Sequence, residues 1–343
     1  MVTVYLHIGL TKVGSTSLSY FLSQNRDILL SHGYLCPITG TTWTKGRNHL
    51  DLAHAHGVPD RFQEYNSNYR PQPGTWEDLF EEVNNSIADK IIISCEGFTG
   101  SGFNESKISQ LKLKLNKFNI VKIIVYIRRQ DIRIQSLYKQ QIKGLGFSEK
   151  IEERLDVLKA KNDYYKLLKP WQKAFGLENI ILKNFDRITE NKDNLYYDFL
   201  KTLKIERFED FKITQNQNIS PGCKVVEVMR CMNKIIIDKL GYSQEYCLKK
   251  YKRPIIKAHV RQKILLDDDK YGLLSTSVIQ SLWQEFEASN KKVSQEYLGL
   301  DNEPLFTSPS TSERKIFKSE DITSYEWQQI MQIILENVEK ISE

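Results

Sequence analysis

The sequence predicts an α/β protein with three layers, in which helices cover both faces of a central parallel sheet, and a mostly helical C-terminal part. Two observations support this prediction. Short runs of β-branched residues alternate with stretches of helical periodicity in the N-terminal part of the chain. Runs such as 119–127 are also apolar on both faces, which is typical of strands in a parallel sheet that is covered by helices on both sides.

The individual elements follow from these periodicities. We expect strands at 2–8, 90–95, 119–127 and 179–185. We expect a first helix that carries Leu18, Phe21, Leu22 and Leu29 and stops at Gly33. A second helix is expected over 131–143, and a third carries Tyr164, Leu167, Leu168, Trp171 and Phe175. Residues 34–76 are rich in Gly, Pro, Thr, Asn and His, and we expect loops with short helical pieces there.

The chain divides into three regions on this basis. Residues 1–215 form the α/β core, and residues 216–300 form a helical region of the same domain that includes the basic stretch 248–263. That stretch is either a solvated helix face or the wall of a groove for an anionic substrate. The region 301–343 begins with a Ser-, Thr- and Pro-rich linker and ends in an amphipathic helix. The apolar stripe of this helix consists of Trp327, Ile330, Ile334, Val338 and Ile341.

The composition favours a soluble protein with an anionic ligand. Charged residues make up 27% of the 343 residues, and 49 Lys and Arg against 43 Asp and Glu give a net charge of +6. So mild an excess does not require nucleic acid, because nucleic-acid-binding proteins usually concentrate their positive charge more strongly. We therefore expect no nucleic-acid partner.

The cysteines and the apolar runs indicate a cytoplasmic protein. The five cysteines are odd in number and contain no C-x-x-C pair, so neither a zinc cluster nor a complete set of disulfides is expected. The N-terminal MVTVYLHIG lacks the basic region and long apolar core of a signal peptide. No run approaches the roughly 20 apolar residues of a membrane span. We expect no integral membrane segment.

The stretch HIGLTKVGSTS, residues 7–17, is typical of an anion-binding loop between a strand and a helix. Backbone N–H groups and the positive end of the helix dipole meet at such a loop, and Ser15, Thr16 and Ser17 add hydroxyl donors. Gly9 and Gly14 keep the glycine spacing of a P-loop NTPase, G-x-x-x-x-G-K-[ST]. The lysine is displaced, however, so we expect no magnesium-nucleotide site. A purely structural turn is the alternative.

A second anion-binding element follows the strand 119–127. Arg128 stands at the end of this strand, and Ser136 lies eight residues further on, in the next helix. Together they could bind a second phosphate of the same ligand, because a guanidinium and a hydroxyl both donate to phosphate oxygens. The alternatives are a surface ion pair for Arg128 and a polar helix face for Ser136. Because Gly9, Glu96 and Arg128 all fall at expected strand carboxyl ends, we expect them at the ligand-binding edge of the sheet.

These two segments resemble a known family. Residues 12–17, KVGSTS, resemble the 5′-phosphosulfate loop of sulfotransferases that use 3′-phosphoadenosine-5′-phosphosulfate (PAPS), and residues 128–136, RRQDIRIQS, resemble their 3′-phosphate motif. The family commonly has Asp-Pro after this arginine, and Arg129-Gln130 here mark a divergent branch. The segments DYYKLLKPWQKAFG and NFDRI are similar to bacterial carbohydrate-type sulfotransferases. The resemblance covers roughly residues 1–205 and then thins to echoes at Asn216 and 286–290.

The resemblance implies a P-loop-NTPase-like fold and the transfer of a sulfuryl group from PAPS to a hydroxyl or amine. The acceptor would be a glycan, a glycolipid or a small metabolite, the product would be 3′-phosphoadenosine-5′-phosphate (PAP), and no metal is needed. Lys12 would stabilise the charge that grows on the bridging oxygen as the 5′-phosphate leaves. The residues that would bind the donor are Lys12, Val13, Gly14, Ser15, Thr16, Ser17, Arg128 and Ser136. Residues 216–300 would lie on the acceptor side.

The general base that takes the acceptor's proton has several candidates. Glu96 ranks first because it follows the strand 90–95 beside the loop, although it could instead orient Lys12 or cap a loop. His49 ranks second, with His54 and His56 on the same segment as lesser rivals. His7 lies inside the first strand and is expected to be a packed, hydrogen-bonded core residue.

Two other classes of function stay open at this point. The spacing of Gly9 and Gly14 allows a degenerate P-loop kinase or NTPase. A non-catalytic nucleotide-binding module, or a basic protein that binds nucleic acid through residues 248–263, is also possible. The sequence does not determine the oligomeric state, and we expect the C-terminal helix to pack on its own domain.

Overall fold

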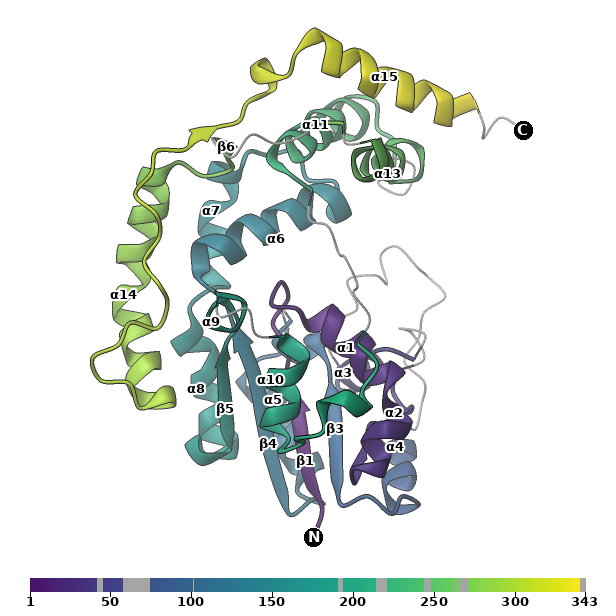
Figure 1. Cartoon of the computed structure of the whole chain (residues 1–343), viewed down its shortest axis with the longest axis vertical. Coiled ribbons are helices and arrows are strands. Elements are labelled where there is room, and N and C mark those ends of the chain that lie inside the picture. Colours follow the sequence, from purple (N-terminus) through teal and green to yellow (C-terminus); the bar gives the residue numbers. More distant parts are fainter. Residues whose placement is uncertain are drawn as a thin grey trace. The chain divides into compact units, whose positions relative to one another are not determined.

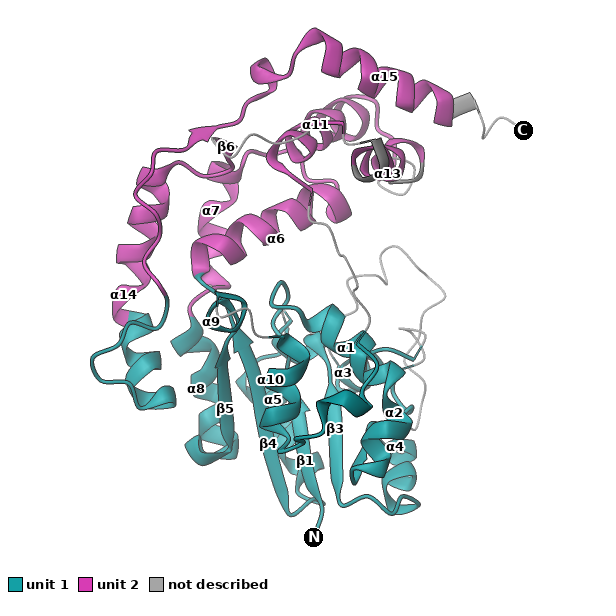
Figure 2. Cartoon of the chain, in the orientation of Figure 1, with its two compact units in different colours: residues 1–129, 164–216, 289–306 teal, residues 130–163, 217–288, 307–343 magenta. Residues whose placement is uncertain are grey.

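The computed structural model describes residues 1–41, 46–57, 75–100, 102–190, 194–213, 221–243, 248–262, 264–265 and 271–339. The chain forms two compact units (Figure 2). Unit 1 contains residues 1–129, 164–216 and 289–306, and unit 2 contains residues 130–163, 217–288 and 307–343. Within the described ranges, no helix has the length and apolar character that a membrane crossing requires.

Unit 1 is built on a parallel sheet of five strands in the order β2-β3-β1-β4-β5 (Figure 1). The strands are β1 (Thr3–His7), β2 (Tyr34–Leu35), β3 (Lys90–Ser94), β4 (Ile120–Ile127) and β5 (Ile180–Asn184). Four of them confirm the expected strands, and the two-residue edge strand β2 was not predicted. Consecutive residues of β3 are fully buried, which means that helices cover both faces of the sheet. The predicted α/β fold with a parallel sheet is therefore confirmed.

The helices of unit 1 flank this sheet. They are α1 (Ser15–Gln24), α2 (Arg26–Ser31), α3 (Leu50–Ala55), α4 (Thr75–Asn84), α5 (Glu105–Leu115), α8 (Tyr164–Phe175), α9 (Phe185–Glu190) and α10 (Leu195–Thr202). Short 3₁₀ turns follow at η1 (Glu96–Thr99), η2 (Leu177–Asn179) and η3 (Phe208–Asp210). In the described part of the segment 34–76, the helical pieces are α3 and the first two residues of α4, in agreement with the expected loops and short helical pieces.

The prediction of one continuous helix from the glycine loop to Gly33 was wrong. The chain breaks at Asn25 into α1 and α2, and the side chain of Asn25 is fully buried. Its amide group donates to the carbonyl of Phe21 at 2.8 Å and to that of Lys212 at 3.0 Å, and it accepts from the Lys212 N–H at 2.8 Å. Because the break at Asn25 depends on bonds to Lys212, which is far away in the sequence, local helical periodicity does not reveal it.

Unit 2 is mostly helical, as expected for the C-terminal part. Its helical elements are α6 (Gln130–Leu145), α7 (Ile151–Ala160), α11 (Cys223–Asn233), η4 (Lys234–Lys239), η5 (Leu248–Lys252), α13 (Arg253–Gln262), η6 (Ser319–Asp321) and α15 (Ser324–Glu339). Helix α14 (Thr276–Leu298) begins in unit 2 and ends in unit 1. Strands β6 (Tyr271–Gly272) and β7 (Lys315–Ile316) form a small parallel sheet.

The compact units interleave along the chain, unlike the continuous regions 1–215, 216–300 and 301–343. Residues 130–163 were expected within the core, yet Ile134, Tyr138 and Ile142 of α6 belong to the apolar cluster of unit 2. The expected linker 301–318 is packed at both ends. Phe306 is buried in unit 1, and Phe317 is buried in unit 2.

Two expectations about unit 2 concern its surface. Helix α15 packs Trp327, Ile330 and Ile334 on the cluster of its own unit, as expected. The side chain of Val338 and residue Ile341 lie outside the described part. The basic stretch 248–263 is not simply a solvated face, because Tyr251, Lys252, Ile255 and Ala258 are buried.

Candidate functional site

The carboxyl ends of three adjacent strands bring the predicted ligand-binding elements of unit 1 together. Strand β1 pairs with β3 on one side and with β4 on the other. The glycine loop follows β1, Glu96 follows β3, and Arg128 follows β4. In open parallel sheets, ligands bind at this edge, where neighbouring connections run to opposite sides. These three segments therefore form the candidate site.

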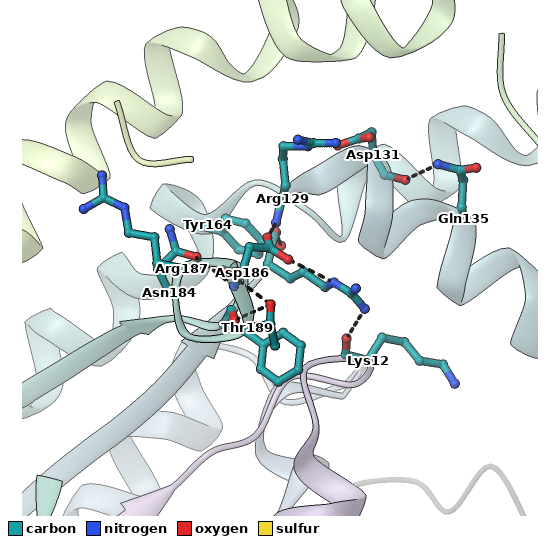
Figure 3. Close-up of polar contacts among 11 residues, drawn as sticks. Lys12, Arg129, Asp131, Gln135, Tyr164, Asn184, Asp186, Arg187 and Thr189 are labelled. Carbon is teal, nitrogen blue, oxygen red and sulfur yellow. Dashed lines mark hydrogen bonds and ion pairs between the residues drawn. The ribbon is translucent and has the colours of Figure 1, made fainter. Parts of the chain in front are cut away.

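The loop between β1 and α1 has an unusual backbone. Gly9, Lys12 and Gly14 have φ values of 24°, 73° and 82°. Positive φ is uncommon for a residue with a side chain, so Lys12 is held by its surroundings. Left-handed residues within such a loop turn successive N–H groups towards one side, and the resulting concavity binds anions. In Figure 3, the side chain of Lys12 extends away from Asp186.

Gly14 is packed against side chains of its own unit, and its role at the anion stays a prediction. A Cβ atom on Gly14 would lie 2.5 Å from Cδ2 of Leu195 and 3.0 Å from Cε2 of Phe185. The space beside this glycine is therefore filled by two side chains of the same unit. Val13, the other apolar residue of the motif, is also buried. These two residues pack the loop against the rest of unit 1, and their backbone N–H groups stay candidates for donor binding.

The three hydroxyl residues of the loop differ in their surroundings. Ser15 is buried and donates to Oε1 of Glu96, and the carbonyl of Leu10 lies 3.2 Å from the same hydroxyl. Thr16 is exposed, and Ser17 is half-buried. Ser15 is thus engaged with the candidate base, whereas Thr16 is accessible to a ligand.

Glu96 lies beside the glycine loop. It begins η1 directly after β3 and is half-buried. The hydroxyl of Thr99, in the same turn, donates to the carbonyl of Gly9 at 2.8 Å and ties η1 to the loop. A Cβ atom on Gly9 would lie 3.3 Å from Cγ of Glu96, so the two segments are in close contact. The carboxylate is therefore held next to the loop that carries Lys12.

His49, the second candidate base, is a core residue in this structure. It is fully buried, its Nδ1 accepts from the N–H of Ser94 at 3.1 Å, and its Nε2 donates to the carbonyl of Pro37 at 3.1 Å. Burial lowers the pKa of His49 from its ordinary value of 6.5 to about 4. With both ring nitrogens occupied, this histidine is poorly placed to take a proton from a substrate, and the geometry favours Glu96.

The buried His49 should make the stability of the protein depend on pH. Because its pKa is 6.5 when exposed and about 4 in the fold, the unfolded chain binds more protons between these values, so stability falls as pH falls through this window. His49→Gln keeps an acceptor and a donor but does not titrate. Between pH 7 and pH 5, the wild type should lose about 2 kcal/mol more stability than His49→Gln in urea unfolding. Equal losses would contradict this assignment.

The remaining histidines have structural surroundings. His7 is buried, and its Nδ1 contacts the hydroxyl of Ser94 at 2.9 Å, which confirms the expected core residue. Burial lowers the pKa of His7 to about 4. His54 is buried on α3. His56 is nearly buried and contacts the carbonyl of Lys107 at 2.8 Å, and burial lowers its pKa.

Arg128 joins β4, the glycine loop and α9 through its bonds to Lys12 and Asp186, which are labelled in Figure 3. Its Nε donates to Oδ1 of Asp186 at 3.2 Å, and its Nη1 donates to the carbonyl of Lys12 at 3.4 Å. The guanidinium also lies over the ring of Phe185, 5.4 Å from its centre, and the Arg128 carbonyl accepts from the hydroxyl of Tyr164. An ion pair was one of the two alternatives for Arg128. Its partner, however, lies at the carboxyl end of β5, at the same edge of the sheet as the glycine loop.

Asp186 is the residue of this site that the sequence did not single out. It lies two residues after β5, and its Oδ2 accepts from the N–H of Arg129 at 2.5 Å. Burial raises the pKa of Asp186, while the bonds from Arg129 and Arg128 oppose this effect. The only signal in the sequence was a carboxylate that follows a strand end in the NFDRI segment.

Ser136 is half-buried on α6 and belongs to unit 2, whereas Arg128 belongs to unit 1. Their joint role at one phosphate therefore stays a prediction. Asn216 lies outside the described residues, and Phe286 is buried in the apolar cluster of unit 2. In the described ranges, no group of three or more His, Cys, Asp or Glu residues could hold a metal ion.

Comparisons with known proteins find relatives of low sequence identity. No family model matches the chain. An uncharacterized protein of Archaeoglobus fulgidus is 30% identical over 241 residues, which are 67% of this chain and 59% of that protein. The chain thus spans less than two thirds of that relative's length. A solved structure, a sulfotransferase from Alicyclobacillus acidocaldarius, covers 71% of this chain and 97% of its own, with a TM-score of 0.41 and 15% identity. Similarity of this degree does not define a function.

Proposed function

We propose that this chain is a PAPS-dependent sulfotransferase that transfers a sulfuryl group to a hydroxyl or amine of a glycan, glycolipid or small metabolite. One observation carries the proposal. The loop of Lys12, the carboxylate of Glu96 and the guanidinium of Arg128 follow three adjacent strands at one edge of the sheet. The four cysteines in the described ranges are free thiols, which suits the reducing cytoplasm.

The residues present fit a donor with two separate anionic groups. The loop after β1 offers backbone N–H groups and the ammonium of Lys12 for the 5′-phosphosulfate. Arg128, whose side chain is 28% exposed, offers a guanidinium for the 3′-phosphate. Ser136 would assist at the 3′-phosphate, as the motif implies. The donor itself supplies the activated sulfuryl group.

The chemistry required of the chain is charge stabilisation and one proton transfer. The acceptor oxygen or nitrogen forms a bond to sulfur while the bond between sulfur and the bridging oxygen breaks, and PAP leaves. Lys12 stabilises the negative charge that develops on the bridging oxygen. Glu96 accepts the proton of the acceptor, and the hydroxyl of Ser15 holds its carboxylate in place.

Calorimetry with PAP in the presence of EDTA tests the donor site. We expect a dissociation constant in the micromolar range, about 10⁻⁶–10⁻⁴ M, without magnesium. Arg128→Met should weaken this binding at least tenfold, because it removes a charge-assisted contact to phosphate. Absence of PAP binding by the folded wild type would refute the proposal, and magnesium-dependent ATP turnover would favour the kinase alternative.

The variant Glu96→Gln distinguishes an enzyme from a non-catalytic binding module. The variant keeps the shape of the side chain but loses the base, so PAP binding should be unchanged while sulfuryl transfer falls by about 100-fold or more. Transfer is measured with labelled PAPS and a panel of cell-surface glycans and small metabolites. If wild type and variant bind PAP equally and neither transfers label to any acceptor, the non-catalytic module is the better description.

A further inference from the structure

Asp186 has more contacts with the donor-binding elements than an ordinary surface ion pair would have. Its two carboxylate oxygens are divided between the Arg128 side chain, at 3.2 Å, and the backbone N–H of Arg129, at 2.5 Å. Its own N–H donates to Oδ1 of Asn184 at 3.0 Å, at the end of β5. The side chain of Asp186 is only 11% exposed. The carboxylate is therefore held firmly between the ends of β4 and β5.

These contacts determine which part of Arg128 faces a ligand. Asp186 occupies Nε, and the carbonyl of Lys12 occupies Nη1. Among the residues that the structure describes, Nη2 has no hydrogen-bond partner, although the guanidinium is partly exposed. An arginine side chain has several rotatable bonds, and fixing two of its nitrogens removes most of that freedom before a ligand binds. Preorganisation of this kind lowers the entropic cost of binding.

Arg128 also connects this carboxylate to the glycine loop. The carbonyl that it contacts belongs to Lys12, whose φ of 73° is disfavoured for a residue with a side chain. The contact therefore helps to hold Lys12 in its left-handed conformation. Asp186, Arg128 and the Lys12 carbonyl form one continuous chain of hydrogen bonds across the ends of β5, β4 and β1 (Figure 3).

We propose that Asp186 is a positioning residue that presents Arg128 to the 3′-phosphate and so sets the preference for 3′-phosphorylated nucleotides. This inference rests on the proposed function. It assigns Asp186 a role through Arg128, without contact to the reacting atoms. It predicts that loss of the carboxylate weakens recognition of the 3′-phosphate more than that of the 5′-phosphate, because the two carboxylate oxygens bond to Arg128 and Arg129 at the end of β4.

The test compares two ligands that differ only in the 3′-phosphate, PAP and adenosine 5′-monophosphate. The measured quantity is the ratio of their dissociation constants, obtained by calorimetry. Asp186→Asn should reduce the preference for PAP by about tenfold, which corresponds to 1.4 kcal/mol. Arg128→Met should reduce it at least as much. The double variant should show no further loss, because both substitutions remove the same interaction.

Asp198→Asn is a matched control in the same unit. Asp198 also pairs with a cation, Lys183, at 3.3 Å, and accepts from the hydroxyl of Tyr126 at 2.7 Å, but it does not contact Arg128. The Asp198→Asn variant should leave the ratio of the two dissociation constants unchanged. If Asp186→Asn, like Asp198→Asn, leaves the ratio of the two dissociation constants unchanged, Asp186 has only a structural role and the inference is wrong. If the wild type binds no PAP, the proposed function itself fails. If Asp186→Asn destabilises the fold, the ratio measured below its melting temperature still decides.

Discussion

Replacement of Lys12 by methionine should abolish most sulfuryl transfer and leave the protein folded. We expect kcat to fall by about 100-fold or more, because in the proposed reaction the ammonium stabilises the leaving bridging oxygen. The melting temperature should change by less than about 2 °C, since a ΔΔG of 1 kcal/mol shifts the melting temperature of a large domain by only a few degrees. Transfer of label from PAPS and thermal unfolding are measured on the same preparation.

Lys12→Gly is the matched variant for this experiment. Lys12 has a φ of 73°, and glycine adopts this conformation without strain. The glycine variant also lacks the ammonium, so it should be as inactive as Lys12→Met. Its free energy of unfolding should stay within about 1 kcal/mol of the wild type, because relief of the left-handed strain offsets the extra entropy of the unfolded chain. A lysine with only a structural role would show the opposite pattern, in which transfer persists and the melting temperature drops.

Replacement of Gly14 by alanine should be strongly destabilising. The added Cβ would lie 2.5 Å from Cδ2 of Leu195, and φ at this position is 82°. The left-handed backbone costs about 1–2 kcal/mol for a residue with a side chain, and overpacking of a buried contact adds about 1–3 kcal/mol. We therefore expect the free energy of unfolding to fall by about 2–5 kcal/mol in urea titrations, the sum of these two effects.

Gly33→Ala is a close control for the backbone contribution. Gly33 has a φ of 81°, and a Cβ atom there would have no heavy atom within 4 Å. It should therefore cost only the conformational part, about 1–2 kcal/mol. The difference between the two variants then measures the contact of the glycine loop with Leu195 and Phe185. Equal destabilisation would mean that these side chains move aside freely, and would contradict the packing role of Gly14.

The sheet, and the edge of it that carries the candidate site, were predictable from the sequence. The strands β1, β3, β4 and β5 start and end within one or two residues of their expected limits. Runs such as Ile91–Ile93 are apolar on both faces because both faces are covered, and this constraint is visible in the sequence itself. Since the carboxyl ends of parallel strands lie at one edge, the presence of Gly9, Glu96 and Arg128 at that edge follows from local patterns, whereas the order that places β1 between β3 and β4 does not.

The tertiary structure alone decided the surroundings of these residues. The sequence ranked His49 as a candidate base, whereas packing buries it with both ring nitrogens bonded. It did not single out Asp186, whose partner Arg128 is 58 residues away, and Arg128 meets the Lys12 carbonyl across 116 residues. The physical reason is one of range. Periodicity and loop chemistry act over a few residues, whereas burial, ion pairs and the break at Asn25 arise only when distant segments pack together.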